Sequence, residues 1–170
     1  MSPDPDRAAA WKPAARERLG RIPGPRELRQ FTRHLVRPTR ASAVRGLVDG
    51  VFVAWTLRRR GVQPLISTNE RNAKLDVKQA KRVAEAVDAG LGVIPMAPTC
   101  LRRSVTLVRE LGRLQLGNAL HIGVRHVDHR LEAHAWVQVG DVVVNDDPKV
   151  TATYAELASG ELERLLPLLR

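Results

Sequence analysis

PTCLRRSVTLVREL, residues 98–111, contains the only cysteine of the 170-residue chain and is typical of the start of a helix. Thr99 is a good N-cap residue, which places Cys100 at the first helical position. The partial positive charge of a helix N-terminus stabilises a thiolate there. Cys100 shares one helix face with Ser104, Leu107 and Leu111. We therefore expect a helix over 99–113 that packs inward and begins with a candidate nucleophile; the alternative is a buried structural thiol.

After this helix the hydrophobic period changes from about 3.6 to 2, which indicates strands. The segments ALHIGVRHV (119–127), AHAWVQV (133–139) and DVVVND (141–146) each have this pattern. Gly140 and Asp141 suit a tight hairpin turn between the last two. The sequence thus predicts a small antiparallel sheet directly after the cysteine helix.

The residues before the cysteine are mainly helical in pattern. We expect a proline-rich arm over 1–25 with a short helix at Ala14–Leu19, and two helices over 26–60 separated near Pro38. DVKQAKRVAEAVDAG (76–90) predicts a helix that begins at the N-cap Asp76 and ends at Gly90. Helices followed by an antiparallel sheet indicate an α+β fold, with a helical N-terminal segment over 1–70 and a core over 71–170.

The second of the early helices has a broad apolar face. It is predicted to be a core helix or a helix that faces a partner, and this face consists of Val44, Leu47, Val48, Val51, Val53 and Trp55. The last stretch, 153–170, is also expected to be helical.

The composition narrows the class of protein. Lys and Arg number 28 against 18 Asp and Glu, a net charge of +10 that attracts polyanions. Only 4% of residues are aromatic and no nucleic-acid motif is present, so a solvated basic surface, including Arg102, Arg103, Arg109 and Arg113, is favoured over a site for DNA or RNA. No segment has the length of a membrane span, no secretory signal is visible, and a single cysteine fits a reducing cytoplasm.

The histidines suggest two possible sites, a metal site and a site built around His134. Four of the five lie between positions 121 and 134, so a metal site must be considered, but the companion ligands that zinc needs at close spacing are missing and no metal is expected. His134 lies between two alanines in a predicted strand, on the same face as Trp136. Without further partners, His134 would be read as a core histidine.

A carboxylate that could orient His134 lies at the end of the next strand, in NDDP. A two-residue turn at Gly140 and Asp141 puts Asp147 opposite His134, whereas a bulge puts Asp146 there. The pattern leaves this choice open. The chain order Cys, His, Asp, on a helix start and two adjacent strands, fits hydrolases or acyl transferases of papain or transglutaminase type.

Four motifs then make the chain resemble a known family. They are C-L-x-R-S from Cys100, L-x-I-G-V from Leu120, A-H-A-W-V from Ala133 and V-N-D from Val144. In order and spacing, over roughly residues 75–155, they resemble the transglutaminase-like leader peptidases of lasso peptide biosynthesis, in the stand-alone form without a leader-recognition domain.

This resemblance implies a fold of transglutaminase or papain type, with the nucleophile helix packed on the sheet. It implies a cysteine protease, with no cofactor, that removes the leader from a ribosomally made precursor peptide. A separate leader-recognition protein and an ATP-dependent macrolactam cyclase, similar to asparagine synthetase, would be its partners. By motif, Cys100 is the nucleophile, His134 the general base and Asp146, not Asp147, the acidic residue.

Further roles follow from these assignments. The oxyanion hole would use the backbone N–H of Cys100 or Leu101 at the helix start. Trp136 would shield the site or line the peptide groove, and a core aromatic is the alternative. Two other functions stay open: acyl transfer to an amine by the same residues, and a non-catalytic basic module that binds RNA or an acidic protein.

Overall fold

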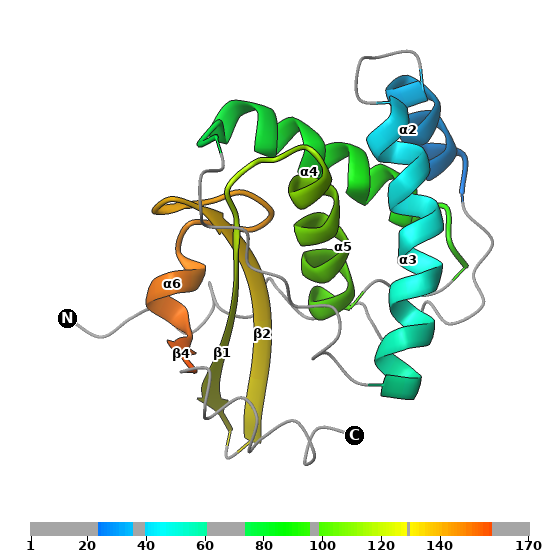
Figure 1. Cartoon of the computed structure of the whole chain (residues 1–170). Coiled ribbons are helices and arrows are strands. Elements are labelled where there is room, and N and C mark those ends of the chain that lie inside the picture. The colour runs from blue at the N-terminus through cyan, green and yellow to red at the C-terminus, as the bar shows by residue number, and fades with distance from the viewer. Residues whose placement is uncertain (1–23, 36–39, 61–73, 96–98, 129, 158–170) are drawn as a thin grey trace.

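The structure is a computed structural model, and it describes residues 24–35, 40–60, 74–95, 99–128 and 130–157. The described chain begins with four helices: α2 (Pro25–Leu35), α3 (Arg40–Arg60), α4 (Val77–Gly92) and α5 (Cys100–Arg113). Three strands come next, namely β1 (Ala119–Val127), β2 (Arg130–Val139) and β3 (Val142–Val143). They are followed by a short helix, α6 (Val150–Thr153), and a short strand, β4 (Ala155–Glu156). The strands form one antiparallel sheet in the order β3-β2-β1-β4 (Figure 1). The predicted α+β fold is confirmed.

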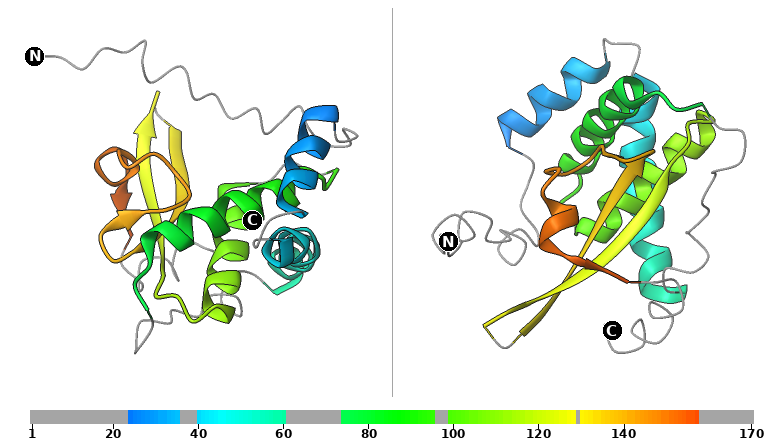
Figure 2. Two further views of the ribbon diagram at one scale, coloured as in Figure 1. Left: turned by 90° about the horizontal axis from the view of Figure 1, so that it is seen from above. Right: turned by 90° about the vertical axis from the view of Figure 1, so that its left-hand side faces the viewer.

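Helix α5 is central to this arrangement. It contacts α3 and α4 on one side and β2 on the other, and the view from above shows the sheet and α3 at opposite sides of the molecule (Figure 2). The main core lies between α4, α5 and the sheet, and it includes Val87, Leu107, Leu111, Val137 and Val139. Burial of these side chains fixes the start of α5 against β2.

The opposite face of β2 has its own smaller core. Because side chains alternate along a strand, His134 and Trp136 point away from Val137. Trp136 packs there with Val143, Val150 and Tyr154. The short α6 and the Tyr154 that follows it therefore cover the face of the sheet on which His134 lies.

The helix starts agree with the capping signals. The side chain of Asp76 accepts a hydrogen bond from the backbone N–H of Gln79 at 2.8 Å, and that of Thr99 accepts one from Arg102 at 3.2 Å. The prediction that Gly90 ends its helix was wrong. A Cβ at Gly90 would lie 2.2 Å from the carbonyl oxygen of Ala43, so this glycine allows α3 to approach closely and α4 continues past it.

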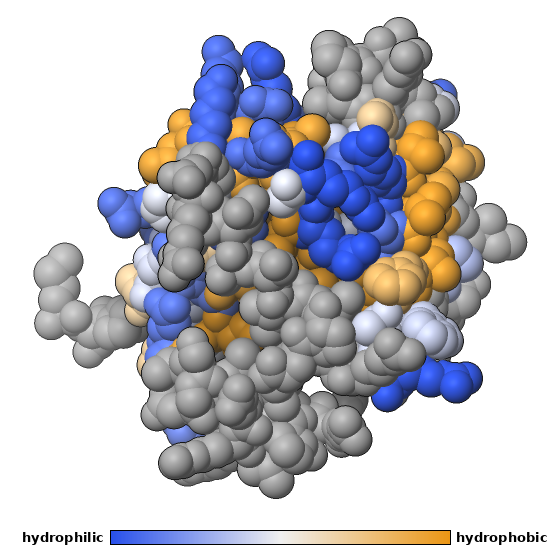
Figure 3. Space-filling model, in the orientation of Figure 1, coloured by the Kyte–Doolittle hydropathy of each residue, from blue (hydrophilic) through white to orange (hydrophobic). Residues whose placement is uncertain are grey.

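The same close approach determines which face of α3 is buried. Gly46 and Gly50 pack against α4, where a Cβ would lie 2.9 Å from Val87 and 2.3 Å from Leu91. The core alternative for α3 was wrong for most of its apolar face: Val53 is buried, but most of the large apolar side chains are exposed, namely Val44, Val48, Val51, Phe52 and Trp55. The alternative that this face meets a partner stays a prediction. Figure 3 shows the resulting hydrophobic surface along the edge where α3 lies.

Several boundaries differ from the sequence-based prediction. Strand β2 begins three residues before the predicted 133–139, and the third strand is limited to Val142–Val143. The predicted terminal helix is wrong at its start, because Ala155–Glu156 pairs with β1 as β4. Two predicted segments lie outside the described residues: positions 1–23 of the predicted arm, with its short helix at Ala14–Leu19, and residues 158–170. The division of the chain at residue 70 stays a prediction.

Candidate active site

Cys100 begins α5, as the sequence predicts. It is partly buried and reduced, and the other residues on its face, Ser104, Leu107 and Leu111, are fully buried. The thiol is hydrogen-bonded to the imidazole of His134 and to the backbone N–H groups of Leu101 and Ala135. The start of α5 therefore points its cysteine at the middle of β2.

The other side of His134 contacts a carboxylate. Its Nε2 lies 2.7 Å from Oδ2 of Asp146, and the histidine is only 4% exposed. Since Nε2 is used in this way, Nδ1 is the ring nitrogen that faces Cys100. The second oxygen of Asp146 accepts a hydrogen bond from the N–H of Asp147 at 2.8 Å, whereas the carboxylate of Asp147 accepts one from Lys149. The structure thus brings Asp146, and not Asp147, to His134.

This outcome differs from both registers that the sequence allowed. The turn is the clean two-residue one, with Val139 paired to Val142, and regular pairing would have put Asp147 opposite His134. The ladder stops early instead. Val144 still donates to the carbonyl of Val137 at 3.0 Å, but the N–H of Val137 donates to a side-chain oxygen, Oδ1 of Asn145, and not to a backbone carbonyl. The chain then turns, and Asp146 reaches the imidazole from beyond the end of the strand.

The protonation states follow from these contacts. Burial raises the pKa of the Cys100 thiol, but the hydrogen bond and the charge of His134, with two backbone N–H groups, outweigh it and hold the pKa below its usual value. Burial also lowers the pKa of His134, yet Asp146 and Cys100 together raise it to about 9. The arrangement therefore favours a thiolate next to an imidazolium.

The acidic member of the site stays ionised. Although burial opposes it, the hydrogen bond from His134 and the nearby Arg103 guanidinium keep the pKa of Asp146 low. An ionised carboxylate fixes the imidazole ring and stabilises its protonated form. The three side chains can therefore support nucleophilic attack by sulfur and proton transfer by the ring.

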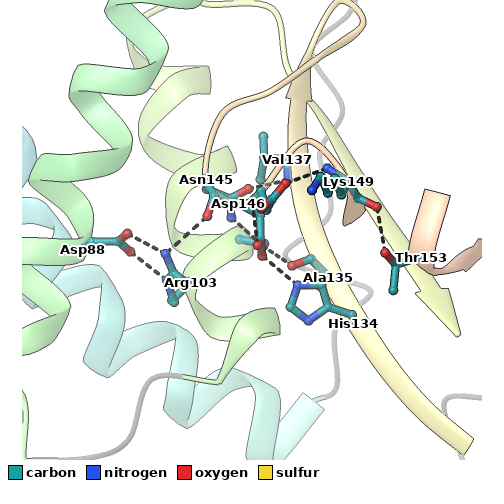
Figure 4. Close-up of polar contacts among 11 residues, drawn as sticks. Asp88, Arg103, His134, Ala135, Val137, Asn145, Asp146, Lys149 and Thr153 are labelled. Atoms are coloured by element: carbon teal, nitrogen blue, oxygen red, sulfur yellow. Dashed lines mark hydrogen bonds and ion pairs between the residues drawn. The ribbon is translucent and has the colours of Figure 1, made fainter. Parts of the chain in front are cut away.

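Two arginines at the start of α5 do not form the solvated surface that was expected. Arg102 is 5% exposed. Arg103 makes a two-pronged ion pair with Asp88 of α4, at 2.9 and 2.6 Å, and its Nη2 also donates to the carbonyl of Asn145 at 3.3 Å (Figure 4). Arg103 therefore joins α4, α5 and the segment that carries Asp146.

The two residues predicted to bind substrate have different environments. Leu101 is partly buried at the helix start. Trp136 is 1% exposed, and its ring stacks between those of His121 and His134, with centroid distances of 5.7 and 6.5 Å. The ring of Tyr154 also stacks on His134, with a centroid distance of 5.0 Å. The aromatic rings thus shield the imidazole from water.

Sequence reasoning placed Arg103 on a solvated surface and Ser104 on the inward face of the helix, and it gave no role to Asn145 or Gly123. All four belong to the sequence motifs, which could have pointed to them. Arg103 and Ser104 are part of C-L-x-R-S, Asn145 is part of V-N-D, and Gly123 is the glycine of L-x-I-G-V. A Cβ on Gly123 would lie 3.0 Å from the Trp136 ring and 2.9 Å from Tyr154. Only glycine lets the two rings close over the strand beside His134.

Two further histidines, His121 and His126, have side chains that the structure describes. His121 contacts Glu156 at 2.6 Å and His126 is exposed. Within the described ranges, no three His, Cys, Asp or Glu side chains gather as a metal site would require. None of the described helices combines the length and hydropathy of a membrane span.

Three comparisons with known proteins were made, and one of them identifies a family. A comparison with curated proteins and one with solved structures each gave no match. A family model described as "Transglutaminase-like superfamily" matches residues 44–159, more than half of the chain, from α3 to just beyond β4. This range includes the thiol, the imidazole and the carboxylate described above, and the family is compatible with a cysteine protease or an acyl transferase. The chain therefore belongs to the transglutaminase-like superfamily.

Proposed function

We propose that this protein is a cysteine peptidase that removes the leader from a ribosomally synthesised lasso precursor peptide, before a separate cyclase closes the macrolactam. The observation that carries the chemistry is the contact of the Cys100 thiol with an imidazole whose other nitrogen lies 2.7 Å from Asp146. The specificity for a leader rests on the resemblance of the four sequence motifs.

The proposed roles follow the geometry. The Cys100 thiolate attacks the carbonyl carbon at the leader–core junction and forms a tetrahedral intermediate. The backbone N–H of Cys100 or Leu101, at the start of α5, would stabilise its oxyanion. As the C–N bond breaks, the His134 imidazolium gives its proton to the departing amine of the core peptide. The leader is left as a thioester on Cys100.

Water completes the cycle. His134, now neutral, takes a proton from a water molecule, which attacks the thioester and releases the leader as a carboxylate. Asp146 holds the ring in position through both steps. Trp136, at 1% exposed, supports the imidazole from within the core in this conformation, and contact of Leu101 with the peptide remains part of the proposal.

The partners in this proposal are a leader-recognition protein, which would present the precursor, and the cyclase, which would use the freed amine. A reducing compartment such as the cytoplasm would keep the single thiol active. Transfer of the acyl group to an amine instead of water needs the same thioester, so the two reactions differ only in the acceptor.

The experiment is mass spectrometry of the precursor incubated with its recognition protein and this protein, wild type beside Cys100→Ala. Loss of a leader-sized mass with wild type only is the expected result. A leader product heavier than the hydrolysed leader by the mass of an added primary amine less one water would favour acyl transfer. An uncut precursor with both proteins, although the recognition protein binds it, would overturn the proposal; salt-sensitive binding of RNA would then favour the binding module.

A further inference from the structure

The edge of β2 that faces α5 is paired with a strand over only two residues. β3 pairs with Gln138 and Val139 and then ends. Of the backbone groups of Ala135 and Val137 on this edge, only the carbonyl of Val137 is still bonded in the register of the ladder, although both residues are buried. Buried backbone N–H and C=O groups need partners, so the partners on this edge show what holds the site together.

All four of these groups are bonded to the segments that carry the site. The N–H of Ala135 contacts the Cys100 thiol, and its carbonyl accepts a hydrogen bond from the Ser104 hydroxyl at 2.9 Å. The N–H of Val137 donates to Oδ1 of Asn145 at 2.8 Å, and its carbonyl accepts from the N–H of Val144. The helix and the loop are thus attached to neighbouring positions of the strand that carries His134.

A single hydrogen bond joins these two attachments. Nδ2 of Asn145 donates to the Ser104 hydroxyl at 3.0 Å, while that hydroxyl donates its only proton to Ala135 (Figure 4). The amide of Asn145 uses both its ends, and Ser104, 0% exposed, has one donor and one acceptor contact. Neither residue can change its partner without leaving a buried polar group unpaired.

The two residues also lie at the right places in the chain. Ser104 is four positions after Cys100, one helical turn away on the same face. Asn145 directly precedes Asp146, and Arg103 holds its carbonyl at 3.3 Å. A change in the Ser104–Asn145 contact would therefore move the thiol and the carboxylate relative to the imidazole between them.

We infer that Ser104 and Asn145 are positioning residues that set the alignment of Cys100, His134 and Asp146 through the open edge of β2. This inference rests on the proposed function only in assuming that the three aligned side chains act together. Neither positioning residue touches the reacting atoms. Misalignment by about 1 Å is enough to cost roughly 10²-fold in rate.

The test measures the thiol itself and needs no substrate. Alkylation of Cys100 by iodoacetamide is followed across pH in wild type, Ser104→Ala and Asn145→Ala. We expect the midpoint of the alkylation profile to move up, toward that of an ordinary thiol, in both variants. Because the two residues share one contact, the double variant should show less than the sum of the two shifts.

The matched control is Thr106→Val, on the same helix. Thr106 is also 0% exposed, but its hydroxyl has no hydrogen-bond partner among the described residues. The alkylation midpoint of this variant should equal that of wild type. Circular dichroism identifies any variant that does not fold, and Asn145→Ala, at a half-buried position, serves if Ser104→Ala fails.

The outcomes separate this inference from the proposed function. A midpoint that stays at the wild-type value in folded Ser104→Ala and Asn145→Ala overturns the positioning role, even if the precursor is cut. A precursor that stays uncut by wild type, with shifted midpoints in the variants, overturns the leader peptidase and leaves the positioning role intact. Where the precursor is cut, kcat should fall roughly 10- to 100-fold in the variants while KM changes little.

Discussion

Asp146→Asn, with Asp147→Asn as its control, is the sharpest test of the site. The two aspartates are adjacent, but only Asp146 contacts His134, at 2.7 Å. The substitution keeps the shape of the side chain and removes its charge. We expect a large loss of activity from Asp146→Asn and a small one from Asp147→Asn.

The magnitude follows from the pKa of His134. A value of about 9 in place of 6.5 corresponds to about 3 kcal/mol of extra stabilisation of the imidazolium, at about 1.4 kcal/mol for each pH unit. Asp146 and Cys100 share this effect. Because these two partners also offset the opposing effect of burial, removing Asp146 should lower the histidine pKa by at least about one pH unit, or roughly 1.5 kcal/mol. Loss of ring orientation adds to this, so kcat/KM should fall roughly 10²- to 10⁴-fold.

The assay is kcat/KM for precursor cleavage as a function of pH. The imidazolium is needed to protonate the leaving amine, so activity should decline as pH rises through the pKa of His134, near 9 in wild type. In Asp146→Asn this decline should begin at lower pH, and in Asp147→Asn it should not move. An unchanged alkaline limb in Asp146→Asn, or equal losses in the two variants, would refute the reasoning.

Two further predictions concern stability. Gly123→Ala places a Cβ 3.0 Å from the Trp136 ring and should lower the free energy of unfolding in urea by about 1–3 kcal/mol, whereas Gly112→Ala, with nothing within 4 Å and inside a helix, should not lower it. In Cys100→Ala, His134 still binds its proton more tightly in the folded than in the unfolded protein. Its contribution to the free energy of unfolding is therefore complete below pH ~6.5 and is lost as pH rises through its raised pKa. Urea unfolding of this variant at several pH values should show that decline in stability. In wild type, stability should change less with pH, because the thiol, whose pKa is lowered in the folded protein, releases a proton on folding.

The local signals in the sequence were sufficient for the element that carries Cys100. A threonine followed by a periodic apolar run predicted the start of α5, and the thiol lies where that prediction put it. Alternation of apolar residues predicted β1 without error in its bounds. Both depend on contacts between residues close in the chain, which a sequence displays directly.

The choice between Asp146 and Asp147 depended on contacts that a sequence does not display. The turn after Val139 is regular, and regular pairing led to the wrong aspartate opposite His134. The side chain of Asn145 replaces a ladder bond and ends the strand. The choice between a buried and an exposed apolar face on α3 was left open for a similar reason, because glycines in two helices pack together only once the tertiary fold exists.

The charges around the thiol explain how a partly buried cysteine can ionise. Asp88 pairs with Arg103, Arg103 acts on Asp146, Asp146 contacts His134, and His134 contacts Cys100. Negative and positive charges alternate along this series of five side chains. Each charged group therefore has only charges of opposite sign as its neighbours in the series. Burial alone would raise the pKa of the thiol, and a lone imidazolium would itself be disfavoured by burial. Because the carboxylate is stabilised in turn from α4 through Arg103, the proton can rest on the imidazole and leave the sulfur ready to attack.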